Sequence, residues 1–243
     1  MKQSTSPIKL IAFDADDTLW RCQDYFDAAQ IEFERLLSRY IDIGNTRVAE
    51  RLLAVERANI ALFGYGVKGM ALSMIEAAIE MTDARITASD LHRIVTIAKE
   101  MLTHPVELLP GIREAVQAIA DVHDVVLITK GDLFHQEAKI AASGMAKQFR
   151  RIEIVSEKDE ATYARLLEQF GIGAHELLMI GNSLRSDILP VLALGGWGVY
   201  MPYHTTWQHE AGEECPADHA RLACASTPAD LPAAVAELVR RAG

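Results

Sequence analysis

The sequence predicts an α/β fold with a parallel sheet, on three observations. Short apolar runs closed by Gly, Ser, Thr or Asp alternate with helical patterns over much of the chain. This alternation favours parallel strands joined by crossover helices. The runs are apolar almost throughout, as is typical of strands covered on both faces. A long helical stretch interrupts the alternation once. The expected strands are Ile8–Phe13, Val125–Thr129, Ile152–Ser156, Leu177–Ile180 and Gly198–Met201.

The helices between these strands are marked by their end residues. Pro110-Gly111 precedes the helical pattern of Ile112–Ala120, and Gly171 follows that of Ala161–Phe170. Proline and glycine commonly mark helix boundaries. Strands and helices in this order predict a three-layer, Rossmann-like core.

The interruption runs from about Asp24 to His104, where no strand pattern is visible. Turn and cap residues divide it into four helical blocks. Four amphipathic helices of this length are enough for a small bundle. We therefore expect residues 1–22 and 106–243 to form the α/β core and residues 23–105 an inserted helical domain. The blocks are Tyr25–Ile41, Thr46–Phe63, Lys68–Met81 and Ala88–Leu102.

Composition limits the classes of function. The 243 residues carry a formal net charge of −10, which argues against binding to nucleic acids or acidic membranes. No apolar run approaches the roughly 20 residues that span a bilayer. The N-terminal residues lack the apolar region of a signal peptide. Three cysteines, without metal-ligand spacing, suit a reducing compartment. We expect a soluble, cytoplasmic protein; the sequence leaves its oligomeric state open.

Two carboxylates follow the first strand, and they are the strongest sign of chemistry in the chain. Asp14 and Asp16 lie two residues apart, with Thr18 two further on. In a continuing strand, side chains two apart point the same way. Carboxylates held this close favour a bound cation or a shared proton. The pair could hold Mg²⁺ or act as nucleophile and general acid. An acidic cap of the next helix is the ordinary structural alternative.

Polar residues also follow other strands, and each group has an ordinary structural explanation. Thr129-Lys130-Gly131 could form an anion-binding nest or only a glycine turn. Lys158 could balance the charge of a bound anion or lie in solvent. Asn182 and Asp187 could ligate a hard cation or cap a helix. To the loop Pro202–Glu210, rich in histidine and aromatic residues, we assign no chemistry, because its spacing matches no ordinary zinc site.

The positions of these polar groups in the predicted sheet suggest that they form one site. The carboxyl ends of parallel strands lie on one edge of a sheet, where open α/β sheets bind their ligands. Four polar groups that each follow a strand are thus expected to converge on one site. Together they offer carboxylates, a hydroxyl, a lysine and further oxygen ligands.

With these motifs in order, the chain resembles the haloacid dehalogenase (HAD) superfamily over nearly its whole length. Phe13–Leu19 is similar to the family's first motif and Leu127–Thr129 to its second, while Lys158 and Gly181–Asp187 match the third and fourth. Leu109-Pro110-Gly111 resembles the point where such chains re-enter the core after a helical cap. The insertion after the first strand is similar to the family's first (C1) cap type.

The resemblance implies a phosphatase with an aspartyl-phosphate intermediate. Asp14 would be the nucleophile and Asp16 the acid and base, with Lys158 balancing charge. Substrate phosphate would meet Thr18, Thr129, Lys130 and Gly131. Mg²⁺ would be held by Asp14, the backbone carbonyl of Asp16, Asn182 and Asp187. The expected activity is Mg²⁺-dependent hydrolysis of a small phosphorylated metabolite.

Two features keep alternatives open. Members of the family that dehalogenate usually lack an acid at the position of Asp16, so its presence favours phosphoryl chemistry over a 2-haloacid dehalogenase. Many relatives carry Asp where this chain has Asn182, so the cation site here lacks one negative charge. A non-catalytic protein that binds or senses a phosphorylated ligand is therefore the alternative from another class. A phosphomutase is the remaining alternative among enzymes.

Overall fold

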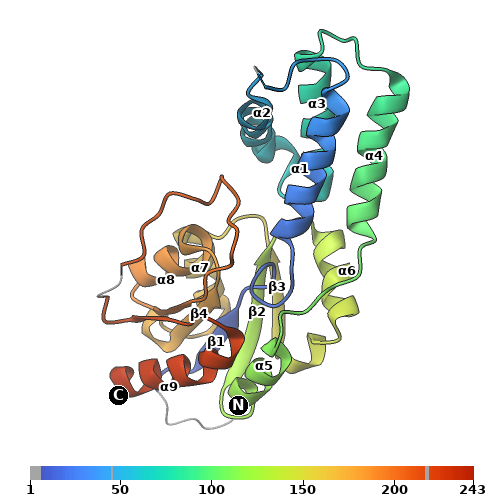
Figure 1. The fold of residues 1–243 in the computed structure, drawn as a ribbon. Helices are drawn as coiled ribbons and strands as arrows, with labels where there is room; N and C mark the ends of the chain where they lie inside the picture. Colours follow the sequence, from blue (N-terminus) through green and yellow to red (C-terminus); the bar gives the residue numbers. More distant parts are fainter. Residues whose placement is uncertain (1–6, 45, 217–218) are drawn as a thin grey trace. The chain divides into compact units, whose positions relative to one another are not determined.

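The chain divides into two compact units (Figure 1). The computed structural model describes residues 7–44, 46–216 and 219–243. One unit joins the N-terminal segment through Arg21 to Val106–Gly243, and the other is Cys22–Pro105. Each unit has a hydrophobic core of its own.

A six-stranded sheet of order β3-β2-β1-β4-β5-β6 forms the centre of the larger unit, and all neighbouring strands are parallel. The first strand lies in the middle, where Ile11 pairs with Val125 on one side and Leu178 on the other. The strands are β1 (Leu10–Phe13), β2 (Asp124–Lys130), β3 (Arg151–Val155), β4 (Leu177–Gly181), β5 (Trp197–Tyr200) and β6 (Leu222–Cys224).

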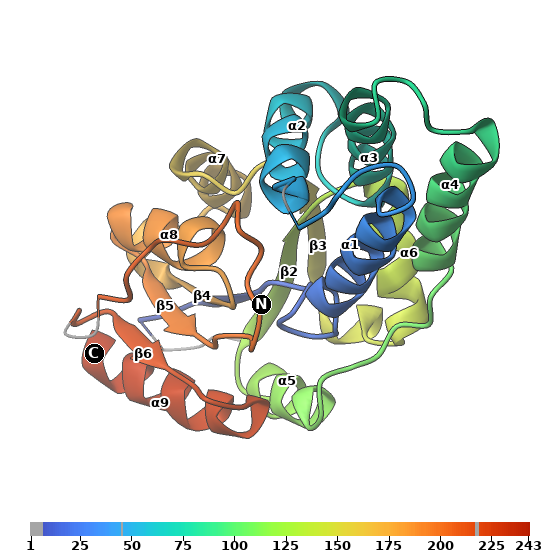
Figure 2. The ribbon, with the colours of Figure 1, turned by 45° about the horizontal axis from the view of Figure 1, so that its top comes forward.

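Helices cover both faces of this sheet (Figure 2). Alternate residues of β1 show the two layers: Ile11 and Phe13 pack with α5 and α9, whereas Leu10 and Ala12 pack with α7. Both faces are therefore apolar, which explains the uninterrupted hydrophobic runs. The predicted three-layer α/β fold is confirmed. Its helices are α5 (Ile112–Ala120), α6 (Leu133–Ser143), α7 (Glu160–Phe170), α8 (Leu189–Ala193) and α9 (Leu231–Ala242).

The five expected strands correspond to β1–β5, with ends shifted by one or two residues. Strand β6 was not predicted, because it has only three residues and lies at the edge of the sheet. A π-helical turn, Leu184–Ile188, was also not expected. Turns of this kind occur often at functional sites.

The smaller unit is helical, with the buried side chains of Phe33, Leu37, Met74 and Ile94 in its core. Its fourth helix begins where the Thr87 hydroxyl accepts a hydrogen bond from the backbone N–H of Asp90. The role of this unit as a cap stays a prediction. Within the described residues, no helix of the chain has the length and apolar character needed to cross a membrane. The helices are α1 (Gln23–Leu37), α2 (Val48–Phe63), α3 (Val67–Met81) and α4 (Ala88–Leu102).

Candidate active site

Asp14 continues the line of β1 and is almost completely buried. Its backbone N–H donates to the carbonyl of Ile180 at 2.9 Å, which holds it against β4. The chain then turns away, with Asp17 in the left-handed region at a φ of 61°. This turn separates the side chain of Asp16 from that of Asp14, although a regular strand would point them the same way.

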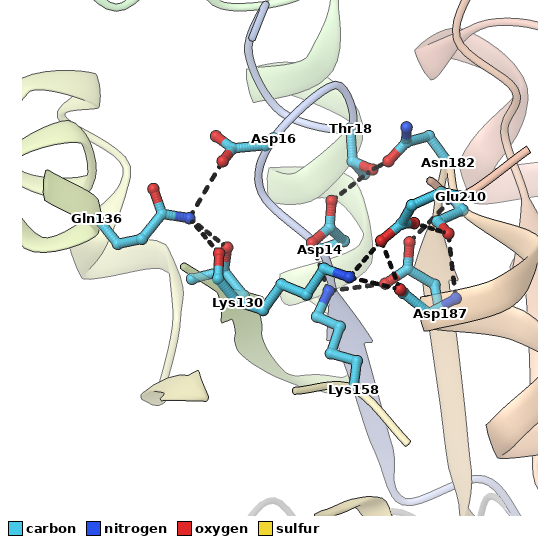
Figure 3. A network of polar contacts seen from close by, with 12 residues as sticks. Asp14, Asp16, Thr18, Lys130, Gln136, Lys158, Asn182, Asp187 and Glu210 are labelled. Carbon is cyan, nitrogen blue, oxygen red and sulfur yellow. Dashed lines mark hydrogen bonds and ion pairs between the residues drawn. The ribbon is translucent and has the colours of Figure 1, made fainter. Parts of the chain in front are cut away.

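Lys158 joins two buried carboxylates, Asp14 and Asp187 (Figure 3). Its Nζ forms an ion pair with Asp14 Oδ1 and lies 2.7 Å from Asp187 Oδ1. The lysine follows β3, and Asp187 lies in the π-helical turn after β4. Three strands of the sheet thus bring three charges together, as the sheet-edge placement predicted.

Gly181 explains how Asp187 reaches this position. A Cβ at residue 181 would lie 2.2 Å from Asp187 Oδ2, so any side chain there would displace the carboxylate. The backbone N–H of Ser183 donates to the same oxygen at 3.0 Å. A glycine at the end of β4 therefore leaves space for the acid that follows it.

Burial determines the protonation of the cluster. It raises the pKa of Asp14 to about 7, against the opposing effect of Lys158 and with the added repulsion of Asp187. Burial likewise raises the pKa of Asp187. For Lys158, burial alone would lower the pKa, but the two carboxylates outweigh it and hold that pKa above its ordinary value. Two carboxylates against one ammonium leave an excess negative charge.

Asp16 is held by a separate set of donors. Its carboxylate lies 2.5 and 2.7 Å from Lys139 Nζ, 2.6 Å from Trp20 Nε1 and 3.2 Å from Gln136 Nε2. In Figure 3 it points toward Gln136. Although burial raises the pKa of Asp16, Lys139 and the two hydrogen-bond donors lower it below its ordinary value. The carboxylate is therefore ionised and fixed in this arrangement.

Thr129 and Lys130, which belong to or follow the second motif, contact different parts of the site. The Thr129 hydroxyl lies 2.6 Å from Gln136 Nε2, which connects it to Asp16. Lys130 Nζ lies 2.9 Å from the hydroxyl oxygen of Ser186 and pairs with Glu210. Gly131 follows with a φ of 133°, a backbone conformation that favours glycine.

Thr18 and Asn182 complete the predicted set. The Thr18 hydroxyl oxygen lies 3.1 Å from Asp14 Oδ2 and 3.2 Å from Asn182 Oδ1, so it donates its single hydrogen to one of them at a time. Thr18 thus brings the amide of the fourth motif next to the predicted nucleophile.

The possible metal ligands around Asp14 fit Mg²⁺. The side-chain donors are oxygens: the carboxylates of Asp14 and Asp187 and the amide of Asn182. The backbone carbonyl of Asp16 is a further ligand that the resemblance implies. Mg²⁺ commonly takes one or two carboxylates and keeps several waters. Among the described residues, no three His, Cys, Asp or Glu side chains form a group that could hold a metal ion. Oxygen ligands of this kind suit a hard, partly hydrated cation.

Sequence reasoning missed four residues of this network, and the first is Trp20, whose Nε1 donates to Asp16. Gln136 and Lys139 lie one turn apart on α6, and both reach Asp16. Glu210 comes from the loop after β5, to which we assigned no chemistry. It accepts hydrogen bonds from the hydroxyls of Ser183 and Ser186 and pairs with Lys130. The sheet-edge rule was a usable signal for Glu210, because its loop also follows a strand.

A model of the haloacid dehalogenase-like hydrolases matches residues 8–195, which include every predicted site residue. The chain belongs to the haloacid dehalogenase-like hydrolase family. The resemblance seen in its motifs is thereby confirmed at the level of the family. A comparison with curated proteins gave no match.

Solved structures agree with membership of this HAD-like family. A haloacid dehalogenase-like family hydrolase from Xanthomonas campestris is 53% identical, with a TM-score of 0.90, and covers 100% of this chain and 97% of its own. A 2-haloacid dehalogenase from Pseudomonas syringae pv. tomato is 18% identical, with a TM-score of 0.61 over 95% of this chain and 99% of its own. A predicted phosphoglycolate phosphatase from Haemophilus somnus is 16% identical, with a TM-score of 0.58 over 94% and 98%. The last two share the fold.

Proposed function

We propose that this HAD-like hydrolase is a Mg²⁺-dependent phosphomonoester hydrolase with Asp14 as its nucleophile. The observation that carries the proposal is the second carboxylate, Asp16, on the loop that follows Asp14. A phosphate ester has a leaving oxygen that needs a proton, whereas a carbon–halogen bond does not. The solved structures that share this fold include a 2-haloacid dehalogenase and a predicted phosphatase. Between these two reactions, Asp16 favours hydrolysis of a phosphate ester.

The proposed reaction has two steps. In the first, a carboxylate oxygen of Asp14 forms a bond to phosphorus while the bond from phosphorus to the ester oxygen breaks, and the leaving oxygen takes a proton from Asp16. In the second, Asp16 removes a proton from water, whose oxygen displaces Asp14 and releases phosphate. Bound Mg²⁺ would offset the repulsion between phosphate and carboxylates.

Other residues support both steps. Lys158 balances charge on Asp14 and on the phosphoryl group. In the proposed complex, Thr129 and the backbone at Lys130 and Gly131 hold phosphate oxygens. Because the donor step needs a protonated Asp16, its ion pair with Lys139 must open during the cycle. We further propose Cys22–Pro105 as the helical cap and a small phosphorylated metabolite in the cytoplasm as the substrate.

The test is hydrolysis of p-nitrophenyl phosphate and a panel of small phosphorylated metabolites, with and without Mg²⁺. We expect turnover that depends on the metal and is lost in Asp14→Asn, because the amide is no nucleophile. Circular dichroism checks that the variant keeps its fold. Release of chloride from a 2-haloacid without added metal would contradict the proposal and identify a dehalogenase.

Asn182 favours a second candidate, a protein that binds a phosphorylated ligand without turnover. The neutral amide stands beside Asp14 where a carboxylate would strengthen cation binding. Under this alternative the natural chain is inactive and Asn182→Asp creates activity. Under the proposed function the natural chain is already active, and the same variant changes mainly the Mg²⁺ concentration that it needs.

A further inference from the structure

Of the described residues in the loop between β5 and β6, Glu210 presents its acidic side chain to the site. The backbone N–H groups of Glu210 and Ala211 donate to the carbonyl of Trp207 at 2.8 and 3.1 Å, which forms a turn. Arg185 Nη1 donates to the carbonyl of His209 at 2.7 Å and fastens this turn to the fourth motif. The Glu210 side chain is only 10% exposed. A buried carboxylate on a loop needs compensating partners.

Glu210 has such partners on both oxygens. Its Oε1 accepts from the Ser186 hydroxyl at 2.8 Å and pairs with Lys130, while its Oε2 accepts from the Ser183 hydroxyl. Lys130 and these hydrogen bonds lower the pKa of Glu210 below its ordinary value, although burial raises it. Figure 3 shows Glu210 beside Asp187 and the head of Lys130. The carboxylate is thus ionised and lies within the predicted metal and phosphate site.

The charges of this site depend on Glu210. A bound cation requires Asp14 and Asp187 in their ionised forms; without Glu210, the ammonium groups of Lys158 and Lys130 would then balance these two carboxylates and leave no net charge. With Glu210, three carboxylates face two ammonium groups. Glu157 also lies 3.5 Å from Lys130, but its side chain is 42% exposed, so solvent screens it. A neutral site would hold a divalent cation weakly.

We propose that Glu210 is the charge-compensating residue of the site. By neutralising Lys130, it preserves a net negative charge that attracts a divalent cation. This compensates for Asn182, whose neutral amide supplies no charge. This inference rests on the proposed function, because it assumes that the site binds Mg²⁺. Glu210 acts through Lys130 and the Ser183–Ser186 turn and is a positioning residue, not a catalytic one. The loop following β5 then completes the metal site electrostatically.

The experiment is calorimetric titration of Mg²⁺ into the full-length, substrate-free protein. We expect Glu210→Gln to raise the dissociation constant about tenfold or more, because Lys130 then loses its least exposed acidic partner and keeps the more exposed Glu157. Lys130→Met should lower the constant, because it removes the opposing charge. The double variant Glu210→Gln with Lys130→Met should return to within about threefold of the natural protein. The exposed Glu213→Gln on the same loop is the matched control and should change little.

The double variant distinguishes an electrostatic role of Glu210 from a purely structural one. If Glu210 only held the loop and the Ser183–Ser186 turn in place, removing Lys130 would not restore binding, and that result would overturn the inference. Unchanged affinity in Glu210→Gln would overturn it too, while leaving the phosphatase proposal intact. No Mg²⁺ binding by the natural protein would overturn both. Circular dichroism of each variant confirms that affinities are compared between folded proteins.

Discussion

At the scale of single residues, Asp16 acts both as a general base and as a general acid in the proposed reaction. Its surroundings favour the first role and oppose the second. A base must be ionised and fixed, and Lys139, Trp20 and Gln136 provide both conditions. A general acid must carry a proton, which the lysine opposes. The arrangement described here therefore suits the second step of the proposed reaction, in which Asp16 removes a proton from water. The first step needs the carboxylate to gain a proton and release Lys139.

The Asp16–Lys139 pair also contributes to stability, which Lys139→Met tests. We expect the variant to lose about 1–3 kcal/mol of unfolding free energy at pH 7, because an ionised carboxylate that is only partly exposed then lacks its cation. The folded-state pKa of Asp16 is lowered, so its stabilising effect is complete above its unfolded value of about 3.9 and is lost as the pH falls through the folded value. The difference between the two proteins should therefore persist from pH 7 to about pH 4 and shrink only below it.

Urea unfolding at pH 7, 5.5, 4 and 3 measures this difference. Lys147→Met, at an exposed position that follows α6, is the matched control for loss of one positive charge. Equal stability of natural and Lys139→Met protein at pH 7, or a difference that grows toward pH 4, would contradict the prediction.

At the scale of elements, the strands that a hydrophobic pattern determines can be predicted from the sequence. Features that depend on tertiary contacts cannot. The strands ending at Phe13 and Thr129 were predictable because burial on both faces makes them uniformly apolar. The strand Leu222–Cys224 was not, because three edge residues carry no such pattern. The helix pattern of α6 does not reveal that Lys139 meets Asp16, 123 residues away. Glu210 reaches the site through a loop, whose path no periodicity encodes.

Helix α2 contains a further element-scale feature, the carboxyl of Glu56. Burial raises its pKa to about 7, so its ionised form is unfavourable in the folded protein. The folded state holds this proton more tightly than the unfolded chain, so the natural protein loses stability as the pH rises from about 4.5 through 7. Glu56→Gln removes this loss. We expect the variant to be more stable by about 1–3 kcal/mol at pH 8 and nearly equal at pH 5.

Thermal or urea unfolding at the two pH values measures this effect. Glu80→Gln, at an exposed position near the end of α3, is the control and should show no comparable dependence. A Glu56→Gln variant that is less stable than the natural protein at pH 8 would show that the carboxylate is stabilised by its surroundings.

At the scale of the whole molecule, all predicted cation ligands belong to the α/β unit, although they are distributed from residue 14 to residue 187 of the chain. A ligand that binds only the folded site stabilises the whole unit that assembles it. The inserted helical unit supplies none of these ligands. Mg²⁺ binding should therefore be visible as stabilisation of the α/β unit, even without any substrate.

We expect Mg²⁺ at about one hundred times its dissociation constant to add about 2.7 kcal/mol to the folded state, or about 5–10 °C in Tm for a protein of this size. Asp14, with its pKa raised to about 7, must lose its proton to bind the cation. Protons therefore compete below this value, so at pH 6 the same Mg²⁺ concentration should give about half the shift seen at pH 8. Differential scanning fluorimetry with Mg²⁺ and with EDTA measures both shifts. Asp14→Asn should show a smaller shift that depends less on pH, because Asp187, whose pKa is also raised, is then the remaining titrating ligand. A shift in the natural protein that is larger at pH 6 than at pH 8 would refute competition between proton and metal at Asp14.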